Sequence, residues 1–270
     1  RSPPPPSPHP GSPPLPPQHP SPGPGGAVVD RINTLFATGR PSNDVAQAGV
    51  LMRTFDEVSH SRQPWLPCPE FIDGAFQRCG RFGDRVPASV VRPGFTHLYT
   101  AGQGGFVIEP SMVRILCSYS HDGLTMKPEK TCDPLGESAR CIPGCGSAPQ
   151  EWCPFAKPWR CAWPPGKLGA MLIEHAKSKG DGQRYEEHNE VVLAAPDYVD
   201  HLPSSLEAVF MLPQTADTGN TYEAQARSAH RAFLSEYRLD ASRVPLVQFE
   251  RHRDPPFSCV DCGASPAATP

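Results

Sequence analysis

The chain has 270 residues, and its 25 basic and 28 acidic side chains give a formal charge of −3 at neutral pH. No run of one charge sign occurs, so the composition disfavours electrostatic capture of nucleic acid or of an anionic membrane surface. No stretch of 18 apolar residues occurs either, so the sequence predicts no membrane-spanning helix. Length and apolar content suffice for one sizeable folded domain, which we expect over residues 27–258.

Residues 1–26 are dominated by proline, which fills thirteen of these positions. A run such as Pro3–Pro6 joins neither a helix interior nor a sheet ladder, because each ring fixes φ and removes an amide donor. Polyproline II remains, and residues 3–24 would then reach roughly 70 Å. We therefore expect a stalk here. The chain has no initiator Met and no signal-peptide apolar run, so we expect a processed product or a fragment whose export signal lies outside it.

Serine precedes proline repeatedly in this stalk, as in Ser2-Pro-Pro-Pro-Pro6. The pattern resembles extensin-like, hydroxyproline-rich glycoproteins of plant and green algal walls. The resemblance implies hydroxylated prolines and O-linked sugars on the following residues: Ser2, Pro3, Pro4, Pro5, Pro6, Ser7, Pro8, Ser12, Pro13, Pro14, Ser21 and Pro22. A ligand for SH3-like modules is the alternative, since residues 3–6 and 13–17 match PxxP. Arg1 is the only basic residue nearby, which disfavours that alternative.

The expected folded domain begins with apolar residues at helical intervals. Val29, Ile32 and Phe36 recur at intervals that predict a helix, and Gly39 is placed to end it. Residues 45–55 fit either a second helix, with Ser42 or Asn43 as its N-cap, or a buried strand. Short strands are predicted at 106–108 and 113–117.

The C-terminal third alternates strand and helix patterns. Strands are predicted at 190–194, 206–212 and 244–249. Residues 196–202 read as a short helix or turn, and residues 222–237 read as a helix with Ala226, Ala229, Phe233 and Tyr237 on one stripe. This alternation predicts an α+β or α/β fold with a mixed sheet and helices, joined to a disulfide-rich, loop-rich region. We assign residues 259–270 to a C-terminal tail.

Ten cysteines, an even number, favour an exported chain, because the cytosol would keep these thiols reduced whereas an oxidising compartment closes them into bridges. The spacing predicts no pairing. A zinc site is disfavoured, since Cys141-x3-Cys145 and Cys259-x2-Cys262 lack matched second halves. Cys259 and Cys262 also match a redox dithiol, but they sit in the expected tail and not at a helix start, so we expect a structural bridge. The predicted disulfide cysteines are Cys68, Cys79, Cys117, Cys132, Cys141, Cys145, Cys153, Cys161, Cys259 and Cys262.

Residues 117–165 gather six of the cysteines and three of the four tryptophans. Glycine and proline interrupt helix and strand patterns there, so order has to come from bridges and from ring packing. A loop-rich minicore is the first interpretation. The second is an aromatic platform for sugars or proline rings, formed by Trp152, Trp159 and Trp163.

Candidate catalytic residues gather at two places. Glu186, Glu187, His188 and Glu190 stand directly before a predicted strand and pair carboxylates with an imidazole, the groups that acid–base catalysis uses. Ser118-Tyr-Ser-His121-Asp122 holds the residue types of a hydrolytic triad, but neighbours on a short turn rarely converge, and no Gly-x-Ser-x-Gly elbow occurs. We therefore count Asp122 only with the acid–base candidates. We expect no metal and no cofactor.

Several short stretches also resemble a domain of secreted proteins of volvocine green algae that are joined to Ser/Pro-rich rods. They are Arg40-Pro-Ser-Asn-Asp44, Gly105-Phe-Val-Ile108, Arg114-Ile-Leu-Cys-Ser-Tyr119, Cys141-Ile-Pro-Gly-Cys145, Asn189-Glu-Val-Val-Leu193 and Leu202-Pro-Ser-Ser-Leu-Glu-Ala208. Pherophorins share the build, although their cysteine spacing differs. The resemblance implies an extracellular structural glycoprotein of wall, matrix or ciliary-surface fibre. Its partners would be other extracellular glycoproteins or copies of itself. A carbohydrate-binding module, with glycan partners, and a secreted polysaccharide- or glycoprotein-modifying enzyme are the alternatives.

Overall fold

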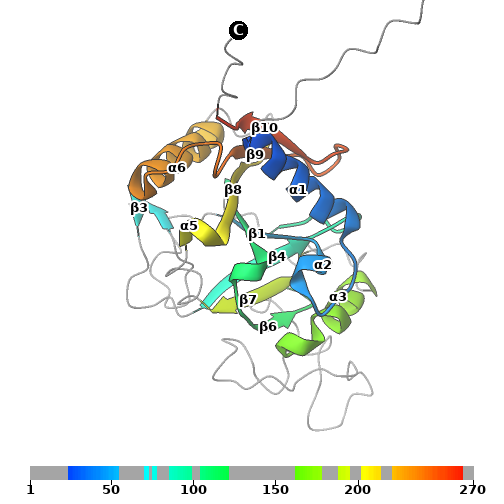
Figure 1. Ribbon diagram of the computed structural model, residues 1–270. Coiled ribbons are helices and arrows are strands. Elements are labelled where there is room, and N and C mark those ends of the chain that lie inside the picture. The colour runs from blue at the N-terminus through cyan, green and yellow to red at the C-terminus, as the bar shows by residue number, and fades with distance from the viewer. Residues whose placement is uncertain are drawn as a thin grey trace, which may run out of the picture.

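The computed structural model describes residues 24–54, 70–72, 75–77, 85–98, 104–121, 162–177, 188–194, 202–213 and 221–263. Their centre is an eight-stranded sheet in the order β10-β9-β8-β5-β1-β4-β7-β6, with helices packed around it (Figure 1). The predicted mixed sheet with helices is therefore confirmed, and the fold is α+β. Residues 1–23 of the predicted stalk and most of the Cys/Trp-rich segment lie outside the described residues, and residues 24–26 are helical in α1.

All neighbouring strands of the large sheet run antiparallel except β8 and β9, which run parallel. Parallel neighbours need a crossover, and helix α6 provides it here. The strands are β1 (Val50–Thr54), β4 (Arg85–Val91), β5 (Gly104–Ile108), β6 (Ile115–Tyr119), β7 (Glu190–Ala194), β8 (Leu206–Met211), β9 (Leu246–Phe249) and β10 (Phe257–Asp261). A separate antiparallel pair joins β2 (Glu70–Ile72) and β3 (Ala75–Gln77).

The helices match the predicted pattern closely at both ends of the chain. They are α1 (Pro24–Thr38), α2 (Val45–Ala48), α3 (Leu168–Lys177), α5 (Leu202–Ser205) and α6 (Thr221–Tyr237), with the 3₁₀ turns η2 (Pro110–Met112) and η4 (Pro165–Lys167). Helix α1 begins three residues before the expected domain start at residue 27. Among the described residues, none of these helices is both long and apolar enough to cross a membrane.

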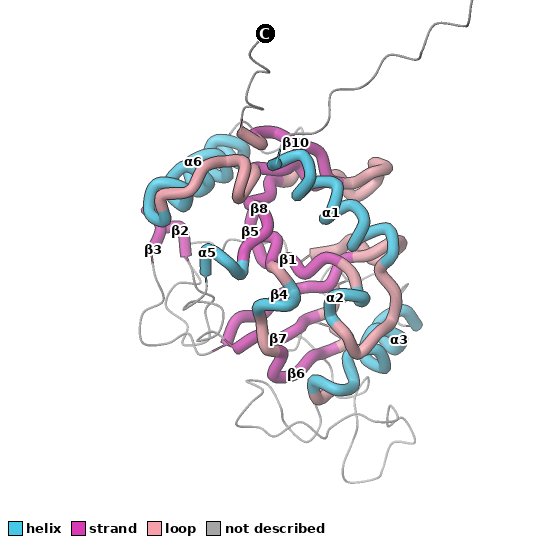
Figure 2. Tube along the Cα trace, in the orientation of Figure 1, coloured by secondary structure: helices cyan, strands magenta, loops and turns pink. Residues whose placement is uncertain are grey.

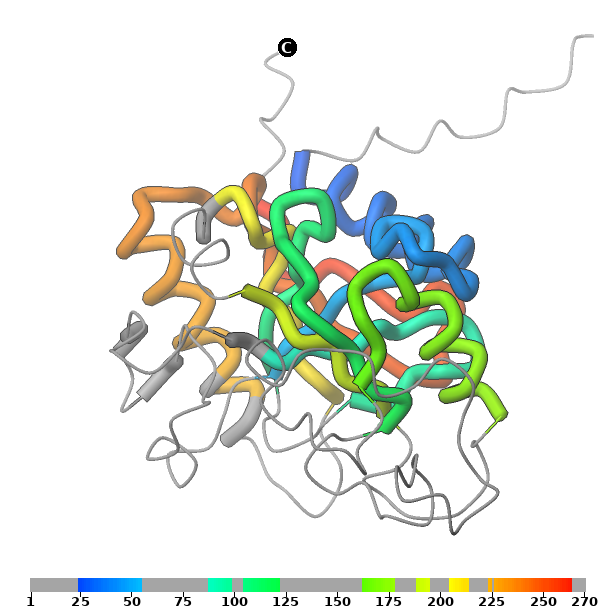
Figure 3. The backbone as a smooth tube through the Cα atoms, turned by 90° about the horizontal axis from the view of Figure 1, so that it is seen from below, coloured from blue at the N-terminus to red at the C-terminus, as the bar shows by residue number. Residues whose placement is uncertain are grey.

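Both faces of the sheet carry apolar core, as the alternation along β8 shows. Val209 and Met211 belong to the cluster that contains Phe233 of α6, whereas Ala208 and Phe210 belong to the cluster that contains Ile32 of α1. Figure 3 shows α6 and α1 on opposite sides of the strands. Burial on both faces explains why these strands read as continuous apolar runs and not as strict alternation.

The ambiguous residues 45–55 contain both predicted structures in succession. The N-cap is Asp44, not Ser42 or Asn43, and its Oδ1 accepts a hydrogen bond from the Ala46 amide at 3.0 Å. Helix α2 ends after one turn at Gly49, whose φ of 139° suits glycine. The buried strand β1 follows and lies between β4 and β5.

Strand β10 corrects the expected start of the tail. It pairs with β9 from Phe257 onward and runs through Cys259 to Asp261, so the folded part extends beyond the predicted boundary at residue 258. Helix α1 lies along this end of the sheet (Figure 2). The first residues of the folded part therefore pack beside its last strand.

Candidate functional site

Four histidines from separate elements lie close together at the β6 end of the sheet. His121 lies two residues after β6, His175 lies on α3, His188 precedes β7, and His97 follows the turn after β4. His175, His121 and His97 each act electrostatically on His188, which places the four imidazoles in one neighbourhood. We call them the histidine cluster.

Two of these imidazoles are oriented by Ser120. The backbone oxygen of Ser120 lies 2.6 Å from His175 Nδ1, which identifies that nitrogen as the donor of the hydrogen bond. The hydroxyl of Ser120 lies 3.0 Å from His121 Nδ1. The rings of His121 and His175 meet edge to face, with centroids 6.3 Å apart, and the His175 ring also contacts Phe95 at 5.5 Å.

Burial keeps His188 of this cluster neutral. Only 4% of His188 is exposed. Desolvation, followed by the neighbouring imidazoles, lowers the pKa of His188 to about 3. A general acid or base at neutral pH needs a pKa near 7, so His188 is not suited to that role.

The described part of the chain contains no group of three or more His, Cys, Asp or Glu side chains arranged to hold a metal ion. Neutral imidazoles still donate and accept hydrogen bonds, as His175 does with Ser120. In the described structure, the hydrogen bonds of Ser120 connect His121, which follows β6, with His175 of α3.

Two of the five predicted acid–base residues fall within the described structure. His188 and Glu190 are both buried, and Glu190 lies opposite Tyr119 in the β6–β7 pairing. These two candidates therefore lie in the packed interior at the start of β7 and not on a solvated loop. Glu186, Glu187 and Asp122 lie outside the described residues.

Trp163 is part of the core. Its side chain is 2% exposed, and its backbone exchanges two hydrogen bonds with Ser118 at 2.8 and 2.9 Å. A ring packed in this way cannot stack on a sugar, so the predicted aromatic platform does not include Trp163. Trp152 and Trp159 lie outside the described residues.

Every cysteine in the described part of the chain is disulfide-bonded. Cys259 is bonded to Cys262, with 6.0 Å between their Cα atoms, and buried Cys117 is also in a disulfide. The predicted bridging is confirmed for these three residues. The remaining seven cysteines lie outside the described residues.

A pair of glutamates was not anticipated from the sequence. Glu109 follows β5, Glu207 lies in β8, and each carboxyl group shifts the pKa of the other. Arg31 of α1 lies 3.3 Å from Glu207 and 3.8 Å from Glu109. The sequence contains one signal for the pair. Glu207 is the single charged residue in the apolar run Leu206–Met211, which otherwise shows no alternation of polar and apolar residues.

These two carboxyl groups titrate differently because their surroundings differ. Glu207 is 1% exposed, and burial and then Glu109 raise its pKa to about 8. Desolvation is the largest influence on Glu109 and acts to raise its pKa, but Glu207, the two hydrogen bonds from Ser111 and the charge of Arg31 together outweigh it, so the pKa of Glu109 is lowered. At neutral pH the pair therefore holds one proton, on Glu207.

Comparison of the sequence with protein-family models finds no match, and comparison with curated proteins finds none either.

Proposed function

We propose that this chain is an extracellular structural glycoprotein of an algal wall, matrix or ciliary-surface fibre. The proline-rich residues 1–23 would form a glycosylated rod, and the α+β domain would mediate assembly with other glycoproteins or with copies of itself.

The oxidation state of the cysteines carries the proposal. Cys117, Cys259 and Cys262, which are all the cysteines that the structure describes, are in disulfides. Such bridges persist in oxidising compartments outside the cytosol. A proline-rich segment without internal hydrogen bonds is a semi-rigid spacer, so it supplies reach while the folded domain supplies contacts.

The arrangement of the domain fits a head joined to a rod. Helix α1 begins at Pro24, directly after the proline-rich residues, and its first turn packs against Cys262 beyond β10. The rod would therefore leave the domain beside the β10 end of the sheet, and the opposite β6 end would remain distant from it (Figure 1).

Mass spectrometry of the protein from its native source tests this proposal. We expect hydroxyproline bearing pentoses or hexoses within residues 2–24. Pro245 and Pro256 are buried in the folded domain and serve as internal controls that should be unmodified. Unmodified prolines throughout residues 2–24 would contradict the structural-glycoprotein proposal.

For each of the two alternative functions, the structure shows that some of the candidate residues are buried. A carbohydrate platform would depend on Trp152 and Trp159 alone. A glycan array that compares the wild-type protein with Trp159→Ala tests it, and equal binding by the two proteins would rule out the platform. An acid–base enzyme would depend on Glu186, Glu187 and Asp122, since His188 and Glu190 are buried.

A further inference from the structure

The Cys259–Cys262 bridge lies at the surface of the domain, at the end of the edge strand β10. Cys259 is exposed, while Cys262 is half-buried against the cluster that contains Val29 and Ile32 of α1. The register of β10 against β9 shifts between Cys259 and Asp261, so the bridge spans an irregular end of the strand. One cysteine of the pair is thus exposed, and the other packs against the domain.

The half-buried cysteine abuts the start of a long helix. A Cβ atom placed on Gly25 would lie 2.8 Å from Cys262 Cβ, so only glycine fits between this turn and Cys262. Helix α1 has 15 residues and no acidic residue in its first turn. The N-terminal end of such a helix carries partial positive charge, which stabilises a thiolate nearby. Asp261 is the acidic group between the two cysteines, and its carboxylate accepts a hydrogen bond from the Gly263 amide at 3.3 Å.

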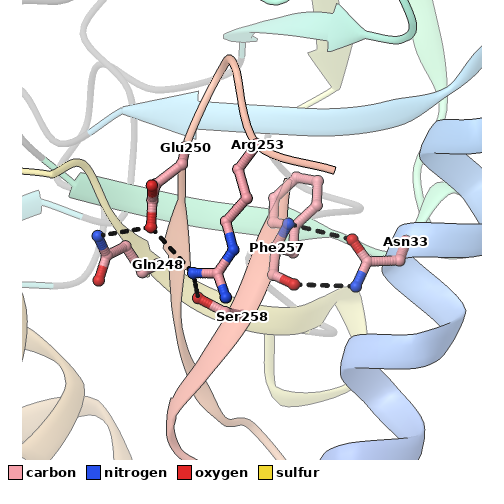
Figure 4. Close-up of polar contacts among 6 residues, drawn as sticks. All are labelled: Asn33, Gln248, Glu250, Arg253, Phe257 and Ser258. Carbon is pink, nitrogen blue, oxygen red and sulfur yellow. Dashed lines mark hydrogen bonds and ion pairs between the residues drawn. The ribbon is translucent and has the colours of Figure 1, made fainter. Parts of the chain in front are cut away.

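Strand β10 is held in place without the bridge. The side chain of Asn33 exchanges two hydrogen bonds with the backbone of Phe257, at 2.9 and 3.1 Å (Figure 4). The ring of Phe257 stacks on Phe249 with centroids 4.8 Å apart. Arg253 bonds to Glu250 and to Ser258 across the hairpin. A bridge that closes a loop of four residues also adds little loop-closure entropy, so its value to the fold is small.

We propose that the Cys259–Cys262 bridge is a site of thiol–disulfide exchange. A thiolate attacks Cys259 Sγ and forms a mixed disulfide with it. The bond between the two cysteine sulfurs breaks, and its electron pair leaves on Sγ of Cys262, the residue that contacts the start of α1. Exchange is faster when the leaving thiol is more acidic, which this position favours. The reaction is an exchange without net oxidation, and it does not depend on a glycosylated rod.

Selective reduction of the folded protein tests the proposal first. The protein is incubated with reduced glutathione at pH 7, quenched with iodoacetamide, and digested for peptide mass spectrometry, while circular dichroism monitors the fold. We expect Cys259 and Cys262 to be modified at least about tenfold faster than the buried Cys117, with the helical signal unchanged. Equal rates at the three cysteines, or labelling only after unfolding, would overturn the proposal.

Two single variants test which sulfur leaves. In Cys259→Ser, the iodoacetamide rate against pH should give Cys262 a pKa below the ordinary thiol value of about 8.5. In Cys262→Ser, Cys259 should titrate as an ordinary thiol, and it is the matched control. Equal pKa values would refute the assigned direction. If either variant does not fold, the wild-type reduction rates still decide the proposal.

The source of the attacking thiol is separated with Cys262→Ser. Incubation with oxidised glutathione should give an adduct on Cys259, and incubation without it should show on a non-reducing gel whether copies link through Cys259. An adduct alone indicates a small-molecule thiol, and linked copies indicate a protein thiol. Neither product on folded protein would overturn the exchange proposal.

Discussion

The two ends of the eight-stranded sheet are closed by different means. At the β6 end, Trp163 pairs with the backbone of Ser118, and Cys117 forms a buried disulfide. At the β10 end, Asn33 pairs with the backbone of Phe257, and the disulfide that follows is exposed at Cys259. Each edge thus has backbone groups satisfied by a partner from outside the sheet, as edge strands require.

The difference lies in what surrounds each closure. At the β6 end, His188 is buried close to three other histidines. It remains neutral there because burial would deprive a charged imidazole of water. The β10 end faces solvent and keeps charged pairs such as Glu250 with Arg253. Substitutions and pH changes at the β6 end should therefore alter the free energy of unfolding strongly, through lost packing and through desolvation. The same changes at the β10 end should alter it only weakly.

Trp163→Ala should have the largest effect. Removing a buried aromatic side chain costs about 4 kcal/mol of unfolding free energy, from lost burial and the cavity that remains. Ile173→Ala on neighbouring α3 is the control, since Ile173 is 49% exposed and should change stability by less than about 0.5 kcal/mol. Urea unfolding measures both. A loss below about 1 kcal/mol for Trp163→Ala would show that the β6 end is not packed as described.

Acid should weaken the β6 end through His188. The unfolded chain takes up a proton near pH 6.5, whereas folded His188 resists protonation until about pH 3. Stability is therefore complete above pH 6.5 and falls toward pH 3, by a total on the order of 4 kcal/mol. His188→Gln should reduce this dependence, and His252→Gln at an exposed position should retain it. Urea midpoints at pH 7 and pH 4 measure the difference, and identical slopes in all three proteins would contradict the burial of His188.

Rising pH should act on the α1 side of the sheet, through Glu207. Its pKa is 4.5 in the reference state and about 8 when folded, so its contribution is fully present below pH 4.5 and is lost as pH rises through 8. The loss is on the order of 4 kcal/mol, because a pKa difference of one unit corresponds to about 1.4 kcal/mol. Glu207→Gln should flatten stability between pH 5 and pH 9, whereas Glu223→Gln, at a partly exposed position of α6, should not. A flat wild-type profile would show that the pair does not hold a proton.

Local patterns predicted most of the described elements, because their signals are contained within short windows. The stripe of Ala229 and Phe233 identified α6, and the apolar run at 190–194 identified β7. The sheet order could not be predicted in this way, since pairing of β1 with β5 and β4 depends on contacts distant in the sequence.

The candidate sites were harder to predict for the same reason. Glu109 and Glu207 are 98 positions apart and meet only because β5 pairs with β8. Cys262 was expected in a tail away from any helix start, and the helix it meets begins at Pro24, at the other end of the folded chain. Residue types and spacing do not predict contacts between residues that are distant in the sequence until the topology is known.

The smallest effect comes from one chemical change made in the sheet interior and at the β10 edge. Asn189 is buried and exchanges two hydrogen bonds with the backbone of Val90, at 2.8 and 2.9 Å, while half-buried Asn33 does the same with Phe257. Asn189→Ala leaves the buried amide and carbonyl of Val90 with neither a protein partner nor water, and should lower the free energy of unfolding by about 2 kcal/mol. Asn33→Ala exposes the same groups to solvent at an edge, and should cost about 1 kcal/mol. Thermal and urea unfolding compare the two variants directly. Equal losses would mean that the β10 edge is as closed to water as the sheet interior, and the exposed bridge beside it would then be less accessible to thiols than its position indicates.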